Sequence, residues 1–365
     1  MNIAIIGTRG IPNQYGGFEQ FADILSCGLA QKGHEITVYC SANHSYQETD
    51  YKGVKLIHKY DPENKIGTVG QFIYDLLCIL DARKRDFDLI YLLGYTSSSI
   101  WQRLLYKRKT VVITNMDGLE WKRSKYSHKV QLFLKYAEKL AVKFSDYLVA
   151  DSIGIQSYLK NKYNVESSYL PYGSFVFEGA IKEDIKAYEV DAFNYDILIA
   201  RFEPENNIEM VLQAFLASDT QRQLLLVGNH KHTEFGKRML DIYGTDKRIR
   251  FMGAIYDQTA LNNLRYYSNL YFHGHSVGGT NPSLLEAMGS SCLICYHNNE
   301  FNRAIVGEDG FAFTDVDILT GIINTKLKTA YRSYIENNRH KIITTYSWKH
   351  IIDQYIQYFS SLIKK

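Results

Sequence analysis

The segment Asn269–His297, NLYFHGHSVGGTNPSLLEAMGSSCLICYH, decides the fold because its pattern changes twice. Its two ends, NLYFHGH and SCLICYH, are short runs rich in apolar residues, which is typical of buried strands. Between them a glycine-containing turn opens the helix-forming run SLLEAMG. A strand, a helix and a second strand in this order predict two parallel strands joined by a crossover helix.

The turn before this helix has the composition of an anion-binding site. A helix N-terminus exposes unpaired backbone N–H groups and the positive end of the helix dipole, and glycines let a ligand approach them closely. We therefore expect Gly279, Thr280 and Asn281 to contact a phosphate, with His275 as a candidate hydrogen-bond donor. Glu286, one turn into the helix, is placed to accept two ribose hydroxyls; ordinary complementarity between an acid and the helix dipole is the alternative.

Strand and helix patterns alternate on both sides of this segment, and the alternation is interrupted once, by charged and poorly periodic sequence in residues 173–192. A chain of 365 residues is too long for one ordinary hydrophobic core. We expect an α/β protein with two Rossmann-like, doubly wound domains, residues 1–172 and 193–345, facing a central cleft. Residues 173–192 are expected to form a linker, and residues 346–365 a C-terminal helix that could pack back on the first domain.

Composition narrows the class of protein. The sequence lacks a run of about 18 apolar residues and begins MNIAIIG, a strand pattern without a basic leader, so we expect a cytoplasmic protein with no membrane span. His273 and His275 have no apparent third ligand, so no metal is expected. The odd number of cysteines and their scattered spacing predict buried, reduced thiols at Cys27, Cys40, Cys78, Cys292 and Cys295.

Positive charge gathers in the first half of the chain. Residues 1–172 hold 22 Lys and Arg against 17 Asp and Glu, whereas residues 173–365 hold 20 against 22. The stretch Lys122–Lys143 alone has seven Lys and Arg and one Glu, interleaved with apolar residues. It predicts a basic amphipathic helix, which either lies on an anionic membrane surface or is a solvated face packed on its own sheet.

A long loop follows the first predicted strand. Gly7–Glu19, GTRGIPNQYGGFE, does not have the G-x-G-x-x-G spacing of a dinucleotide site, which disfavours a nicotinamide cofactor. Gly16 and Gly17 stand directly before a helix, where the backbone can approach a ligand, and Arg9 adds positive charge. We expect a binding loop here, because a plain structural turn would be shorter.

A second loop, Met116–Arg123, follows the strand TVVITN. Its Asp117 and Glu120 can accept sugar hydroxyls or act as a base, and capping of a helix by Asp117 is the alternative. Trp121 could stack on a sugar ring or fill core space.

Arg201 follows the strand YDILI in the motif ARFEPENN. An arginine at a strand end is a costly core residue, but its planar guanidinium suits a bidentate phosphate contact. Ion pairing with Glu203 or Glu205 is the alternative.

Four motifs in this order, GTRGIPNQYGGFE, NMDGLEWKR, ARFEPENN and GHSVGGTNPSLLEAM, resemble the retaining glycosyltransferases of family 4, which have the two-Rossmann GT-B fold. More narrowly, they look like a bacterial subgroup that includes rhamnosyltransferases of surface polysaccharide assembly. The resemblance spans essentially the whole chain. It implies that Gly16 and Gly17 contact the donor diphosphate, that Arg201 binds phosphate and that Glu286 binds ribose.

Two positions depart from the family pattern. The family has a Lys where this chain has Asn206, and a Glu, which usually binds the donor sugar, where this chain has Gly278. The missing Glu suggests a donor with different hydroxyls, and the 6-deoxy sugar L-rhamnose on dTDP fits the subgroup.

The resemblance implies transfer of a hexose from a nucleoside diphosphate sugar to a lipid-linked glycan with retention of configuration. Asp117 and Arg201 are the expected catalytic residues, and Glu120 and Arg123 the expected acceptor-binding residues. No cofactor, metal or nucleic acid partner is expected, and the protein would act at the inner face of the cell membrane. An epimerase of nucleotide sugars with the same fold and a non-catalytic subunit of a polysaccharide assembly complex remain the alternatives.

Overall fold

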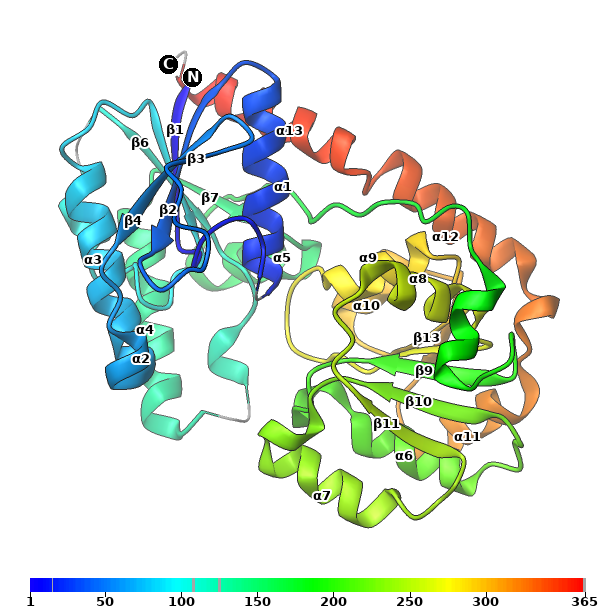
Figure 1. Ribbon diagram of the computed structural model, residues 1–365. Helices are drawn as coiled ribbons and strands as arrows, with labels where there is room; N and C mark the ends of the chain where they lie inside the picture. Colours follow the sequence, from blue (N-terminus) through cyan, green and yellow to red (C-terminus); the bar gives the residue numbers. More distant parts are fainter. Residues whose placement is uncertain (15, 107–108, 124–125, 364–365) are drawn as a thin grey trace. The chain divides into compact units, whose positions relative to one another are not determined.

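The computed structural model describes most of the chain, namely residues 1–14, 16–106, 109–123 and 126–363. Residue 15 of the glycine loop, residues 124–125 of the basic stretch and residues 364–365 of the predicted C-terminal helix lie outside the described residues. The chain divides into two compact units (Figure 1), which are unit 1, Met1–Tyr172 with Trp348–Lys365, and unit 2, Gly173–Ser347.

Unit 1 is built on a parallel sheet with one antiparallel edge strand. Within the described residues the strand order is β3-β4-β2-β1-β5-β6-β7-β8, and only β3 pairs antiparallel, with β4. Strand β1 lies between β2 and β5, so successive strands are added on one side of β1 up to β4 and on its other side from β5 onward. The strand order of the sheet therefore reverses at β1. The strands are β1 (Asn2–Ile6), β2 (Glu35–Ser41), β3 (Asp50–Tyr51), β4 (Val54–Lys59), β5 (Leu89–Leu93), β6 (Val111–Asn115), β7 (Tyr147–Ala150) and β8 (Ser168–Tyr169).

The helices of unit 1 differ from the sequence prediction in two places. The sequence pattern of residues 97–107, SSSIWQRLLYK, favours a helix, but in the described residues 97–106 the helical part is a short 3-10 turn at Gln102–Leu104. Serine hydroxyls compete for backbone groups here, as Ser98 does by donating to Gly94 O at 3.2 Å. The basic helix begins at His128 rather than Lys122. The helices are α1 (Gly17–Gln31), α2 (Glu63–Ile66), α3 (Gly70–Ala82), α4 (His128–Phe144), α5 (Ile153–Tyr163) and α13 (Trp348–Ile363).

The C-terminal helix α13 belongs to unit 1 and packs against α1 (Figure 1). Gly28 of α1 permits close contact, because a Cβ there would lie 2.3 Å from Cδ1 of Ile352. Tyr355 packs edge-on against Phe21, with ring centroids 5.7 Å apart, and its hydroxyl hydrogen-bonds that of Tyr91 at 3.0 Å. An aromatic layer therefore joins the two ends of the chain in one core.

Unit 2 is a parallel sheet with the order β11-β10-β9-β12-β13-β14 among its described residues. Its direction of growth changes between β9 and β12, which pair directly. The strands are β9 (Tyr195–Ile199), β10 (Gln223–Val227), β11 (Ile249–Gly253), β12 (Tyr271–His273), β13 (Ile294–His297) and β14 (Phe311–Phe313). The helices are α6 (Ile208–Ala217), α7 (Glu234–Tyr243), α8 (Gln258–Tyr267), α9 (Pro282–Gly289), α10 (Glu300–Val306), α11 (Val316–Thr325) and α12 (Arg332–Thr344).

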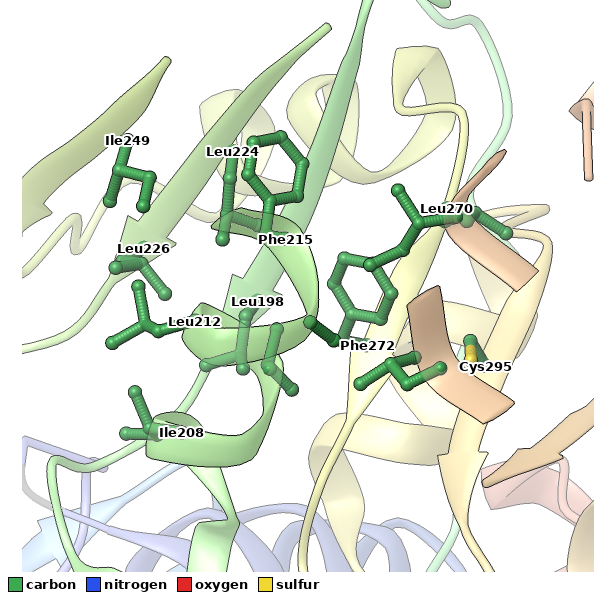
Figure 2. Close-up of a cluster of buried hydrophobic side chains, with 14 of the residues drawn as sticks. Leu198, Ile208, Leu212, Phe215, Leu224, Leu226, Ile249, Leu270, Phe272 and Cys295 are labelled. Atoms are coloured by element: carbon green, nitrogen blue, oxygen red, sulfur yellow. The ribbon is translucent and has the colours of Figure 1, made fainter. Parts of the chain in front are cut away.

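The core of unit 2 lies between α6 and the sheet. Figure 2 shows Leu212 and Phe215 of α6 beside strand residues such as Leu198, Leu226 and Phe272, all of which are at most 1% exposed. Each strand contributes alternate residues to this face, as the pleat requires.

Residues 173–192, expected to be a linker, pack within unit 2. Asn263 of α8 accepts a hydrogen bond from Ile181 N and donates one to Asp184, each at 2.8 Å. The charged, aperiodic sequence therefore forms an ordered strap over α8, with a 3-10 helix at Lys182–Tyr188.

All five cysteines are buried and free, as predicted. No helix in the described part of the chain is long and apolar enough to span a membrane.

Candidate active site

Ligands of doubly wound sheets bind beyond the carboxyl ends of the strands, where the direction of growth changes. In unit 2 that point lies between β9 and β12. The predicted donor-binding residues Arg201, His275, Gly279, Thr280 and Asn281 all follow these two strands. The fold of unit 2 therefore gathers them at one edge of its sheet.

The N-terminus of α9 is formed as its sequence predicts. Asn281 caps the helix, because its Oδ1 accepts a hydrogen bond from Ser283 N at 2.9 Å, and Pro282 occupies the first helical position. Gly278 and Gly279 have φ values of +66° and +67°, in the left-handed region that favours glycine. A Glu at position 278 would be strained by this backbone, which explains locally why a glycine stands there.

Hydrogen bonds hold the segment after β9 against the segment after β12. Asn206 Nδ2 donates to Arg201 O at 2.7 Å, and Asn206 Oδ1 lies 2.9 Å from His275 Nδ1. Asn207 Nδ2 donates to Gly274 O at 2.7 Å. A Cβ at Gly274 would lie 2.0 Å from Asn206 O, so only glycine allows this approach. The two loops are thus joined by side-chain hydrogen bonds and by a close approach of their backbones.

Arg201 is exposed at this edge. Within the described residues no carboxylate lies at ion-pair distance from its guanidinium, so neither Glu203 nor Glu205 forms the predicted alternative pair. Asp196, at the start of β9, instead pairs with Arg222 at 3.1 Å. The geometry leaves the charge of Arg201 available to a ligand.

Glu286 forms an ion pair that the sequence did not indicate. Its Oε2 accepts a hydrogen bond from Arg265 Nη2 at 2.6 Å; the Arg265 side chain is 2% exposed and that of Glu286 22%. Arg265 also donates to Asn262 Oδ1 at 2.9 Å. The buried guanidinium holds the carboxylate in one orientation, which is what a ribose-binding acid requires. The one sequence feature that indicates a buried partner for Glu286 is the single Arg, Arg265, in the helix pattern NNLRYYS.

His273 lies at the end of β12 and is 4% exposed. Burial, followed by the nearby His275 and His297, lowers the pKa of His273 to about 3, so its imidazole is neutral at physiological pH. Among the described residues no group of three His, Cys, Asp or Glu is arranged to hold a metal ion.

In unit 1 the loop Gly7–Glu19 contacts β5 through Gly7 and α2 through Arg9. A Cβ at Gly7, whose φ is +103°, would lie 2.4 Å from Leu93 O. Arg9, expected to offer charge to a ligand, forms a bidentate pair with Glu63 at 2.9 and 2.7 Å. This pairing lowers the pKa of the Glu63 carboxyl, because Arg9 hydrogen-bonds its charged form. The charge of Arg9 is therefore already paired.

Gly16 directly precedes α1, and Gly17 is the first residue of that helix. The φ of Gly16 is −161°, extended backbone that any residue adopts. A Cβ at this position would lie 3.1 Å from Oε2 of Glu19, which is tight. The glycine therefore keeps the helix N-terminus open beside Glu19.

The loop after β6 carries the predicted acceptor residues. The 3-10 turn Glu120–Lys122 is preceded by Leu119, so Asp117 is not its N-cap residue, and Asp117 lies partly exposed beyond the strand. Glu120 and Arg123 pair with each other at 2.7 Å. Glu120 and Arg123 therefore form a local ion pair in this loop, and Asp117 lies between that pair and the end of β6.

A buried carboxylate fixes this loop on α4. Glu138, 1% exposed, accepts hydrogen bonds from Tyr158 (2.8 Å), Tyr163 (2.7 Å), Lys162 (2.9 Å) and Trp121 Nε1 (3.2 Å). Burial, and then the hydrogen bonds to Glu138, raise the pKa of both tyrosines. Trp121 is therefore anchored through its indole N–H, and sequence reasoning missed Glu138 because it sits in an otherwise basic helix.

Two families match the chain. Residues 181–341 match the family described as glycosyl transferases group 1, and residues 1–175 match a domain of unknown function, DUF1972. No curated protein matches the chain.

Several solved structures share the fold along nearly their whole length. A sucrose-phosphate synthase from Thermosynechococcus elongatus is 18% identical with a TM-score of 0.82, covering 100% of this chain and 99% of the other. HepE from Anabaena, in complex with UDP and glucose, is 14% identical with a TM-score of 0.76 and coverage of 98% and 99%. A glycosyltransferase from Rickettsia africae is 14% identical with a TM-score of 0.73 and coverage of 100% and 98%. The two parallel-sheet domains are those of the GT-B fold.

Proposed function

We propose that this chain, whose residues 181–341 match the glycosyl transferases group 1 family, transfers L-rhamnose from dTDP-L-rhamnose to a hydroxyl of a lipid-linked glycan. The observation that carries the proposal is that the exposed Arg201 follows β9 and the glycine-opened N-terminus of α9 follows β12, the strand paired with β9. Both are at the switch point of unit 2, where a diphosphate would sit.

The leaving nucleotide acquires negative charge as the glycosidic bond breaks. In our proposal Arg201 and the backbone N–H groups of Gly279–Asn281 stabilise that charge, and preorganised dipoles of this kind supply a large part of catalysis. Glu286, oriented by Arg265, accepts the ribose hydroxyls. HepE, a structural neighbour, was crystallised with UDP and with UDP-glucose, which supports a nucleotide sugar as the donor.

The choice of L-rhamnose rests on Gly278. A glycine offers no carboxylate to a sugar hydroxyl, and its left-handed backbone disfavours replacement by Glu. A 6-deoxy sugar has one hydroxyl fewer to bind. A panel of dTDP-L-rhamnose, UDP-glucose, UDP-galactose and GDP-mannose tests this choice, and release of nucleotide from dTDP-L-rhamnose alone is expected. Turnover of another donor would discard rhamnose and keep the transferase.

In this proposal the acceptor hydroxyl attacks the anomeric carbon of the donor sugar from the same face that the nucleotide leaves. The product therefore retains the configuration of the donor. Asp117 would position the acceptor hydroxyl or take its proton. NMR of the product's anomeric centre tests this point, and inversion would contradict it.

The exposed side of α4 supports a membrane-facing acceptor. Leu132 and Tyr136 are 51% and 56% exposed, and Lys129, Lys139 and Lys143 are exposed around them. Apolar side chains ringed by lysines suit an anionic lipid surface. Flotation with phosphatidylglycerol vesicles should carry the protein upward in low salt, and replacing the three lysines by Glu should abolish it. Equal binding to neutral vesicles would contradict the electrostatic part of the proposal.

A further inference from the structure

The amide of Asn206 is oriented by its neighbours. Its Nδ2 donates to Arg201 O at 2.7 Å, and a backbone carbonyl can only accept. The oxygen of the amide is therefore the atom 2.9 Å from His275 Nδ1. Because an amide oxygen also only accepts, Nδ1 of His275 must carry a proton.

The backbone of His275 is fixed on its other side. Asn299 Nδ2 and Asn302 Nδ2 both donate to His275 O, at 3.0 and 2.9 Å. The next residue, Ser276, donates from both N and Oγ to Glu205 O, at 2.9 and 2.8 Å. The imidazole is thus held in place and in one tautomer, three residues before Gly278.

We propose that Asn206 is a positioning residue, which holds Nδ1–H of His275 so that Nε2 binds the donor diphosphate as part of an imidazolium. This inference rests on the proposed function, because it assigns a second cation to the same phosphate site. On binding, the ring takes one proton from solvent at Nε2 and donates it as a hydrogen bond to a phosphate oxygen. No covalent bond forms or breaks.

The hydrogen bond to Asn206 is compatible with protonation of His275 at Nε2. The amide oxygen accepts from Nδ1–H in both the neutral and the charged ring, so the ring gains a charge without losing a partner. A charge-assisted bond to phosphate then favours the cation. Among the described residues, the segments that contact His275 through Asn206, Asn299, Asn302 and the His273 ring carry the titratable residues His273, His297, Arg201, Glu203, Glu205, Glu300 and Arg303. His273 stays neutral, since burial lowers its pKa to about 3, and so adds no repulsion at physiological pH.

The experiment is calorimetric titration of UDP and of dTDP into the full chain between pH 5.5 and 8.5, in two buffers of different ionisation enthalpy. For whichever nucleotide binds, we expect uptake of up to about one proton, and affinity falling about tenfold per pH unit above the His275 pKa. His275→Gln should remove this dependence. Asn206→Asp should move it to higher pH, because a carboxylate beside Nδ1–H favours the imidazolium.

The exposed His232 of the same unit provides the control, since His232→Gln should leave the pH dependence unchanged. NMR of the ring nitrogens of His275 without ligand is a second readout. A neutral ring protonated at Nδ1 is expected in the wild-type protein, and protonation at Nε2 alone would overturn the inference.

Unchanged proton uptake in both His275→Gln and Asn206→Asp, with nucleotide still bound, would overturn the inference and leave the proposed function standing. Failure of the wild-type protein to bind either nucleotide at any pH would overturn both.

Discussion

Arg265 Nη2 donates to Glu286 Oε2 at 2.6 Å from a side chain that is almost fully buried. A guanidinium at this depth is stable only while its counter-charge stays in place. The pair therefore links the stability of α8 and α9 to the orientation of the acid that we assign to ribose.

Replacing Arg265 by Met should destabilise the protein by about 2–4 kcal/mol, because it leaves one partner of a largely buried pair without the other. Urea unfolding measures this loss. Glu286→Gln is the informative companion, since it keeps the shape and should raise the KM for the donor more than it changes the unfolding midpoint. A loss below about 0.5 kcal/mol in Arg265→Met would contradict the assigned role of the pair.

Arg201→Ala should lower kcat/KM by about 100-fold, in the range measured when one donor to a developing oxyanion is removed. The unfolding free energy should change little, because Arg201 is exposed and forms no ion pair with the described residues. Steady-state kinetics with the active donor checks this. Arg238→Ala is the control, since Arg238 is a 55% exposed arginine of the same unit that pairs with Glu209. Equal effects of the two changes would remove Arg201 from the site.

Asp117→Asn should slow transfer by about 100-fold while donor affinity stays within a factor of about two. The substitution keeps the shape of the side chain and removes its capacity to take a proton. Nucleotide binding measured beside turnover separates the two effects. A variant that turns over at the wild-type rate would exclude Asp117 as the base.

The buried carboxyl of Asp75 should make the free energy of unfolding depend on pH. It is 4% exposed on α3 and accepts a hydrogen bond from Ser97 Oγ at 2.6 Å; burial raises its pKa to about 7. A carboxyl whose pKa is higher in the folded than in the unfolded chain is destabilising when ionised, so its contribution worsens as pH rises from about 4 to about 7. Asp75→Asn should therefore be more stable than wild type by about 1–3 kcal/mol at pH 8 and equal at pH 4. Equal stability at both pH values in urea unfolding would contradict this.

The sequence predicted the parallel sheets because apolar strand runs and helix patterns alternate along the chain, as β9 and α6 illustrate. It failed where serine hydroxyls compete with helical hydrogen bonds, in the segment before Gln102–Leu104. It also missed the strand β3, which has only two residues. Short elements of this kind depend on tertiary contacts that no local pattern contains.

For the site, glycine turns and residues after strands could be read from the sequence, and Arg201 and Asn281 lie where their motifs placed them. The hydrogen-bond and ion-pair partners of the site residues could not be predicted from the sequence, because they come from distant segments of the chain. Arg265 lies 21 residues from Glu286 and Asn206 lies 69 residues from His275. Pairing of Arg9 with Glu63 was missed for the same reason.

Acceptor-dependent release of nucleotide is the most direct test of the central claim that this chain is a transferase of sugars from nucleotide donors. The purified protein would be incubated with dTDP-L-rhamnose, with and without a bacterial membrane lipid extract, beside Arg201→Ala. The account predicts dTDP release that needs the extract and is about 100-fold slower in the variant. Absence of turnover and of binding with every donor in the panel would contradict the account.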